Sequence, residues 1–350
     1  MSAKKYVSIF LVLLLLFVLF HAFVWFTITK QIFQPSDNLK VGDLGRMSYL
    51  KSSFSKRELL NDLPRKHNDF TKIEQIDIVT IGDSFSNGAA AGKNPFYQDY
   101  IATDKNLTVL NIQPLKEGYI ETVVALYNSG FLKEISPKII ILESVERTCI
   151  GRFSKEIDWN FNLNKEKLLQ DFQVKYDDKK PELSLVNNLN YNAFLYSILY
   201  YFDDKAFFSS VYLSEVSKKL FSGREQSKFL YFKDDLTNID ASNERSISLL
   251  NDNLNALQKL LKQKNTQLYF MPAVDKYNLY SKYIVKNKYP QSKFYELLRE
   301  LPHDYYFVDT KLILQKLTDN DVIDVYYPDD THWSYKASAE ISKSLAIKLD

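Results

Sequence analysis

A β-branched apolar run breaks off at a turn of small residues in Ile78-Val79-Thr80-Ile81-Gly82-Asp83-Ser84-Phe85-Ser86-Asn87-Gly88. Because residues 78–81 are apolar on both faces, they predict a buried strand of the kind found in parallel sheets. The turn then puts Ser84 just past the carboxyl end of that strand, which is where open α/β sheets bind ligands. If a helix begins at this turn, its free N–H groups would also stabilise negative charge on a bound oxygen.

A serine hydroxyl is a weak nucleophile, and it needs a base that is usually a histidine held by a third group. The chain has four histidines, and His332 lies near the C-terminus in Tyr327-Pro328-Asp329-Asp330-Thr331-His332-Trp333-Ser334. An acid two residues before a histidine, in a turn after a proline, can reach the imidazole and fix its tautomer. An early serine and a late Asp-x-His together predict a triad of Ser84, His332 and Asp330.

The two motifs Gly82-Asp83-Ser84-Phe85 and Asp330-Thr331-His332-Trp333 resemble those of the SGNH/GDSL hydrolase superfamily, over about residues 70–350. The chain looks most like the branch of alginate and related polysaccharide O-acetyltransferases, in which a D-x-H-W motif accompanies the serine. The resemblance implies a three-layer α/β fold with a central, mostly parallel sheet. It also implies that Ser84 is the nucleophile and His332 the base.

The acid that orients His332 has two candidates, since Asp329 and Asp330 are adjacent. The spacing in the wider superfamily would favour Asp329, whereas the acetyltransferase branch favours Asp330 because Trp333 completes its D-x-H-W string. We therefore expect Asp330 to hold His332 and Asp329 to face solvent.

The oxyanion donors are harder to place, because the G-x-N-D block of the superfamily has no counterpart in this chain. The Ser84 backbone N–H is one expected donor. The superfamily's second glycine block would make the backbone N–H of Gly118 another, although Gly118 is equally well explained as an ordinary glycine between a loop and a helix. Trp333 is a further candidate for this region.

Three other residues follow predicted strands on the active-site side of the sheet. Arg147 comes after the strand at 139–142 and could orient an acyl donor or a sugar carboxylate, or form a local ion pair with Glu146. Lys276 and Tyr280 come after the strand at 267–272, and the family likeness makes them candidates for substrate positioning. The alternative is a solvated loop lysine and a packed tyrosine.

Composition excludes several classes of protein. The formal net charge of +2 gives no basis for nucleic-acid binding. The single cysteine, Cys149, cannot form a disulfide within the chain and is expected to be packed in the core. Histidine pairs with zinc-protease spacing, cysteine clusters and a phosphate-binding GKS or GKT loop are all missing, so we expect neither a metal nor a cofactor.

The N-terminus carries an almost wholly apolar run from Tyr6 to about Ile28, which is long enough to span a bilayer as a helix. Lys4 and Lys5 precede it, and this bias favours a cytoplasmic N-terminus. A cleaved signal peptide is the rival interpretation. The length of the run and the lack of a small-x-small cleavage site favour an uncleaved anchor, with the rest of the chain outside the cytoplasm, or in the periplasm of a Gram-negative cell.

These features divide the chain into a cytoplasmic tip and anchor at 1–30, a stalk at 31–75 with a short helix near 55–63, and a catalytic domain at 76–350. The regular α/β pattern stops between about 151 and 235, which predicts a helical insertion. Within it, the aromatic stretch 191–202 predicts a helix. We expect this helix to be buried in the core or to form a lid, with a position at a membrane interface as the less favoured alternative.

The function expected from these residues and from the resemblance is transfer of an acyl group, most simply acetyl, to a cell-envelope or extracellular polysaccharide. Because acetyl-CoA is cytoplasmic, the resemblance implies a multi-pass membrane-bound O-acyltransferase as the partner that supplies acyl groups. An esterase with the same triad is an alternative that the sequence does not separate. A non-catalytic polysaccharide-binding scaffold is a second alternative, which intact Ser84 and His332 disfavour.

Overall fold

The protein is described by a computed structural model that covers residues 2–34, 41–50, 63, 76–90, 92–172 and 183–347. A five-stranded sheet in the order β2-β1-β3-β6-β7 forms its centre, and all of its neighbouring strands are parallel. The strands are β1 (Ile78–Ile81), β2 (Val109–Ile112), β3 (Ile139–Val145), β6 (Gln267–Ala273) and β7 (Tyr306–Phe307). The predicted α/β class with a mostly parallel sheet is confirmed.

Helices cover this sheet in two groups. From β1 the chain runs outward to β2, and then back past β1 to β3. Because such crossovers are right-handed, the helices of these two connections lie on opposite faces of the sheet. One group comprises α4 (Tyr97–Lys105), α14 (Thr310–Asp319) and α15 (Tyr335–Ser344). The other comprises α5 (Tyr119–Asn128), α6 (Phe131–Ile135), α7 (Glu146–Phe153), α11 (Glu244–Lys262) and α13 (Phe294–Arg299).

Strands β1 and β3 are buried along their whole length, as their continuous apolar runs predict. They pair in register, with Ile78 opposite Ile139 and Ile81 opposite Leu142. The chain leaves β1 toward one edge of the sheet and leaves β3 toward the other, so these two strands form the topological switch point. The turn that carries Ser84 follows β1 at this point.

The predicted insertion at 151–235 is not purely helical. It contains α8 (Lys165–Phe172), α9 (Leu189–Phe202) and α10 (Asp234–Thr237), but also an antiparallel hairpin of β4 (Val211–Glu215) and β5 (Lys228–Phe232). The hairpin is joined to the turn that carries Asp330 and His332, because the backbone N–H of Leu230 donates a hydrogen bond to the Pro328 carbonyl at 2.8 Å.

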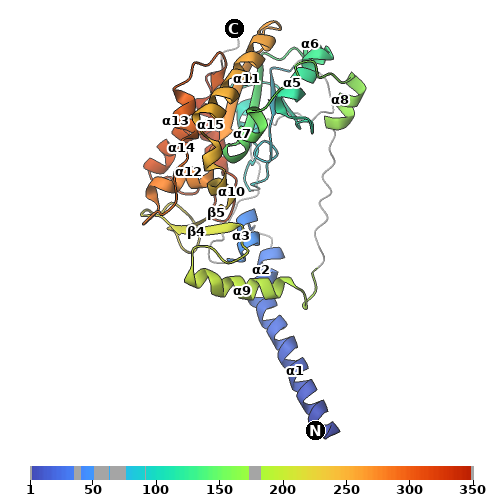
Figure 1. The fold of residues 1–350 in the computed structure, drawn as a ribbon, viewed down its shortest axis with the longest axis vertical. Helices are drawn as coiled ribbons and strands as arrows, with labels where there is room; N and C mark the ends of the chain where they lie inside the picture. The colour runs from blue at the N-terminus through green and yellow to red at the C-terminus, as the bar shows by residue number, and fades with distance from the viewer. Residues whose placement is uncertain are drawn as a thin grey trace.

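The N-terminal segment is helical from α1 (Ala3–Val24) through a π-helical turn (Trp25–Thr29) into α2 (Lys30–Phe33). Within the described ranges, this 31-residue run is the helix that is long and apolar enough to cross a membrane. It projects away from the rest of the molecule in Figure 1. A short helix, α3 (Asp43–Ser48), then packs beside the β4–β5 hairpin. The helix predicted near 55–63 lies, apart from Leu63, outside the described residues.

Candidate active site

The chain leaves β1 through Gly82, where only a glycine fits. A Cβ atom at this position would lie 2.0 Å from Ser86 Oγ and 2.4 Å from Glu143 Oε2. The residues that follow form hydrogen-bonded turns, and the backbone N–H of Asn87 donates to the Ser84 carbonyl at 3.2 Å. The helix that would have begun at this turn is therefore not present, and no helix dipole acts on the Ser84 hydroxyl from here.

Ser84, His332 and Asp330 come together as a hydrogen-bonded relay, although 248 residues separate the serine from the histidine. Ser84 Oγ lies 2.7 Å from His332 Nε2, and His332 Nδ1 lies 2.7 Å from Asp330 Oδ1. Asp330 Oδ1 also accepts the backbone N–H of His332 at 3.0 Å, which fixes the acid and the base in one turn. This is the arrangement in which a histidine can remove a proton from a serine hydroxyl.

The surroundings of His332 favour its protonated form. Burial alone would lower the pKa of this imidazole, but the hydrogen bond and negative charge of Asp330, together with the charge of Asp43, outweigh burial and raise the pKa above its usual value. His332 is 8% exposed, so water screens these charges weakly. The imidazole is thus set up as a stronger base than a histidine in water.

Asp43 reaches the site from the segment that the sequence analysis assigned to a stalk. Its Oδ2 lies 3.9 Å from His332 Nδ1, and its Oδ1 accepts the backbone N–H of Thr331 at 2.8 Å. Burial and the nearby charge of Asp330 raise the pKa of Asp43. Sequence reasoning missed this residue, because a lone acid in a mixed polar segment carries no signal of its own.

Asp329 is fully buried and is not the solvent-facing neighbour that the sequence suggested. Its Oδ2 accepts the backbone N–H of Gly42 at 2.7 Å, and its carbonyl accepts that of Gly45 at 2.9 Å. The two adjacent acids thus have different tasks. Asp330 orients His332, whereas Asp329 holds the start of α3 against the catalytic turn.

Lys276 is buried beneath the same turn, in the short helix α12 (Lys276–Tyr280). Its Nζ donates to the carbonyl oxygens of Tyr327, Pro328 and Asp330 at 2.6, 2.9 and 3.0 Å. Burial lowers the pKa of Lys276 to about 7, against the opposing effect of nearby carboxylates. The lysine therefore holds the catalytic turn in place. It is neither in a position to meet substrate nor the solvated loop lysine of the alternative interpretation.

Tyr280 and Trp333 are packed in the core. The Tyr280 hydroxyl accepts the backbone N–H of Tyr326 at 3.2 Å, so this tyrosine also supports the catalytic segment from below. The Trp333 ring is 2% exposed and packs edge-on against Phe85, with ring centres 4.8 Å apart. The Phe85 ring centre also lies 4.8 Å from that of His332. Trp333 therefore supports, from the protein interior, both the turn that carries Ser84 and the turn that carries His332.

Arg147 lies at the carboxyl end of β3 but pairs with two buried acids. Its Nη1 is 2.6 Å from Asp275 Oδ1 and 3.3 Å from Asp235 Oδ1. Glu146, its expected partner, instead accepts hydrogen bonds from the backbone of Asp275 and from Ser292 Oγ, at 2.9 and 2.6 Å. Burial raises the pKa of Glu146 to about 7. Arg147 thus joins the insertion to the end of β6 by ion pairs.

Gly118 is the cap that precedes α5, and its backbone N–H is already used. It donates to the Leu115 carbonyl at 3.1 Å, which closes a tight turn. The glycine has a φ of +147°, and a Cβ here would lie 2.1 Å from Glu121 Oε2 and 2.8 Å from Lys155 Nζ. The structure thus favours the ordinary loop-to-helix glycine over the oxyanion donor. By contrast, no described residue accepts a hydrogen bond from the Ser84 N–H.

Arg152 and Asp83 support the serine turn and were not identified from sequence. Arg152 Nη1 contacts Asp83 Oδ2 at 2.5 Å and Ser144 Oγ at 2.7 Å. The same Asp83 oxygen accepts the backbone N–H of Val145 at 2.9 Å, which ties the turn to the end of β3. Burial would raise the pKa of Asp83, but the Arg152 charge and these hydrogen bonds lower it overall. One sequence feature could have indicated this pair: Arg152 is a charged residue in α7, the helix that directly follows β3.

Asp43, Asp330 and His332 each offer a ligand atom within 4.8 Å of the others, so these groups could share a metal ion. A metal on Nδ1 would have to replace the 2.7 Å hydrogen bond between His332 and Asp330. The intact relay to Ser84 fits acid–base chemistry by the side chains themselves better than it fits a metal centre.

The comparisons with known proteins add no relative to this geometry. No family model, no curated protein and no solved structure matches the chain.

Proposed function

We propose that the chain is a membrane-anchored O-acyltransferase of SGNH type, which transfers an acyl group, most simply acetyl, to a polysaccharide outside the cytoplasm. The observation that carries this proposal is the Ser84–His332–Asp330 relay, with two 2.7 Å contacts at the carboxyl edge of a parallel sheet. The N-terminal apolar helix supports a location at the membrane. A multi-pass membrane-bound O-acyltransferase is the proposed source of acyl groups.

The proposed reaction has two steps. His332 Nε2 removes the proton of Ser84 Oγ as this oxygen attacks the acyl carbonyl of the donor ester. The tetrahedral intermediate collapses, the donor alcohol leaves with the proton from His332, and the acyl group stays on Ser84. His332 then deprotonates a sugar hydroxyl, whose oxygen attacks the acyl-enzyme. As the bond from the acyl carbon to Ser84 Oγ breaks, His332 returns the proton to this oxygen, which releases the acylated sugar and regenerates Ser84.

The negative oxygen of each intermediate needs hydrogen-bond donors aimed at it. The Ser84 backbone N–H is the proposed donor. Gly118 is no longer part of this proposal, because its N–H donates to the Leu115 carbonyl. Asp330 and Asp43 contribute indirectly, by stabilising the imidazolium that exists while His332 carries the proton.

The test is the intact mass of the full chain in lipid nanodiscs after mixing with p-nitrophenyl acetate. We expect an acetyl adduct on the wild type and on Ser248→Ala, an exposed serine of α11, but none on Ser84→Ala. Added oligosaccharide should then receive the acetyl group. Release to water alone would make the protein an esterase, and a folded wild type without an adduct would refute Ser84 as the nucleophile.

A further inference from the structure

Helix α9 lies across the end of α1 and is fixed there by a buried histidine (Figure 1). His21 is 1% exposed and contacts two neighbouring side chains of α9. Its Nδ1 is 2.9 Å from Asn190 Nδ2, and its Nε2 is 3.2 Å from the Tyr191 hydroxyl. A polar residue in an apolar helix is costly unless it is paired, so these contacts set one position of α9 along α1.

The inner side of α9 is covered by the protein. Ala193 is fully buried in a small apolar cluster with Val24 and Ile32. Further along the helix, the Tyr200 hydroxyl donates to the Val211 carbonyl at 2.8 Å, which attaches α9 to β4. The opposite side of the helix therefore faces away from the domain.

That outer side is apolar and uncovered. α9 contains no charged residue, and the short segment after it adds two more exposed aromatics. The exposed side chains are Tyr191, Phe194, Leu195, Ile198, Tyr201, Phe202, Phe207 and Phe208. Tyr201, Phe202 and Phe208 are 84%, 79% and 82% exposed. Contiguous apolar surface of this kind marks a binding site for a protein or a membrane.

Two observations favour a membrane as the occupant. First, the outer side of α9 continues into the exposed surface of α1, since the Phe20 ring lies 5.4 Å from those of both Tyr191 and Phe194. Second, Ala3 and His21 are 18 positions apart in α1, which is about 27 Å of helix at ~1.5 Å per residue. This is close to the ~30 Å hydrocarbon core of a bilayer. If α1 spans the membrane, α9 therefore lies at the level of the lipid headgroups.

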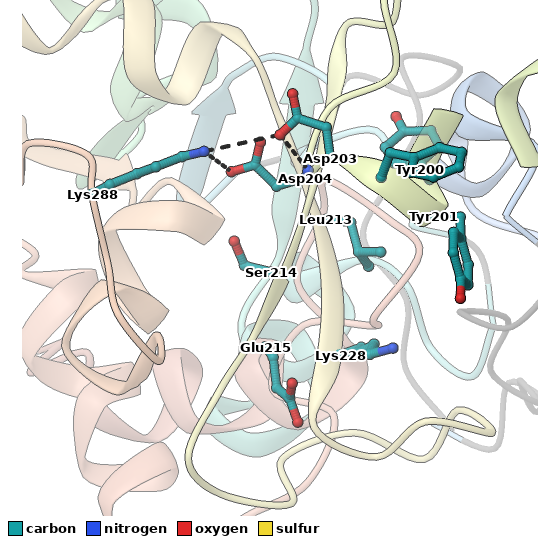
Figure 2. Close-up of a pocket in the computed structure, with 10 residues that line it drawn as sticks. Tyr200, Tyr201, Asp203, Asp204, Leu213, Ser214, Glu215, Lys228 and Lys288 are labelled. Carbon is teal, nitrogen blue, oxygen red and sulfur yellow. Dashed lines mark hydrogen bonds and ion pairs between the residues drawn. The ribbon is translucent and has the colours of Figure 1, made fainter. Parts of the chain in front are cut away.

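The outer side of α9 ends next to a group of charged side chains. Figure 2 shows a hollow beside the end of α9, with Lys288 directed toward Asp203 and Asp204, and Tyr201 on the other side. Lys288 Nζ is 3.0 Å from Asp204 Oδ2. The hollow, of about 320 Å³, includes none of the triad residues. Tyrosine is enriched where lipid meets water, and helices that lie in this interface carry Phe and Leu on their apolar face.

We propose that α9 and Phe207–Phe208 form one membrane-binding surface, the foot of the catalytic domain. The foot lies on the outer surface of the bilayer and holds the catalytic domain there. The foot is linked to the triad by two short connections. Tyr200 binds β4, and β5 binds the catalytic turn through the 2.8 Å contact between Leu230 and Pro328. The segment that follows the N-terminal apolar helix is also joined to the same turn, through Gly42 and Asp329. The site is thereby held near a donor located in the membrane.

The inference rests on the proposed membrane anchor. Its test measures how deep labelled residues lie in the bilayer and does not depend on enzyme activity. A nitroxide is attached to single cysteines in the full chain, reconstituted in phosphatidylcholine–phosphatidylglycerol vesicles. The positions are Phe202→Cys and Phe208→Cys, with Leu13→Cys and Lys259→Cys as controls. Wild type should take no label, because Cys149 is buried. Collisions with oxygen and with a water-soluble nickel chelate report the depth of each label.

We expect the Leu13 label deep in the hydrocarbon, the Lys259 label in water, and the labels at 202 and 208 at a depth between them. Labels at 202 and 208 that match Lys259, with Leu13 still in lipid, would overturn the foot alone. A Leu13 label in water would overturn the anchor itself. Labels at 202 and 208 shielded from both reagents, in vesicles and in detergent alike, would mean that a second copy of the chain covers this face, which also overturns the inference.

Discussion

Asp43 and Thr331 are 288 residues apart, and the Asp43 carboxylate accepts both the backbone N–H and the hydroxyl of Thr331. This contact joins the start of α3, close behind the N-terminal apolar helix, to the residue between Asp330 and His332. Beside it, Gly42 donates to Asp329 at 2.7 Å. The catalytic turn is therefore completed by the segment that leads out of the proposed membrane anchor, so the position of the anchor and the geometry of the base are physically connected.

Replacing Asp43 by asparagine should shift the pH dependence of turnover. His332 must be neutral to accept a proton, so the rate rises as pH passes through its pKa. The charges of Asp330 and Asp43 raise this pKa. Asp43→Asn removes one of them, so the rise should move to lower pH. The measurement is the pH profile of p-nitrophenyl acetate turnover, and Asp321→Asn, an exposed acid, is the matched control. An unmoved profile would show that the Asp43 charge does not act on the base.

Removing the Lys276 amine should misplace the triad without touching substrate. Lys276→Met removes one hydrogen-bond donor from each of three carbonyl oxygens in the 327–330 turn. We expect a stability loss of about 2–4 kcal/mol and a fall in kcat of about ten- to a hundredfold, with little change in KM. Lys282→Met breaks an exposed pair with Asp319 and should cost about 1 kcal/mol or less. A large rise in KM with an unchanged kcat would point back to substrate positioning.

The triad was predictable from sequence because its signals are local. A continuous apolar run followed by Gly-Asp-Ser determines both the strand and the place of Ser84, and a two-residue spacing lets Asp330 reach His332. The α/β class follows from similar buried runs in β3 and β6. Only the approach of Ser84 to His332, 248 residues apart, depends on how distant segments pack.

The rest of the site depends on such packing. Asp43 and Asp329 meet through a fold that brings residues 42–45 to residues 329–331, and no local pattern marks either end. In the sequence, Lys276 cannot be told apart from a solvated loop lysine. Only the fold brings three carbonyl oxygens to its Nζ. The β4–β5 hairpin was missed because its residues lie in an insertion with no regular apolar period, where the rings of Phe229 and Tyr231 pack against Tyr280 and Tyr277 of α12.

Gly118→Ala should act on folding and not on chemistry. The glycine has a φ of +147°, and an added Cβ would collide with the Glu121–Lys155 pair. We expect a stability loss of about 1–3 kcal/mol, with kcat of the folded protein within about twofold of wild type. Gly151→Ala is the matched control, since nothing lies within 4 Å of its added Cβ. A fall in kcat of a hundredfold at unchanged stability would contradict this and show that the backbone position at Gly118 matters for the chemistry.

Chelation should leave the activity intact, although Asp43, Asp330 and His332 are close enough to share a cation. Both ring nitrogens of His332 are engaged, one with Ser84 and one with Asp330, each at 2.7 Å. A metal on Nδ1 would break the second contact and remove the partner that raises the pKa of the imidazole. Turnover by the full chain in nanodiscs should therefore be unchanged by EDTA, and excess Zn²⁺ should inhibit it by competing for His332. A different outcome would establish a metal-dependent site. EDTA would abolish the activity of the wild type, one divalent ion would restore it, and EDTA would have no effect on Asp43→Asn.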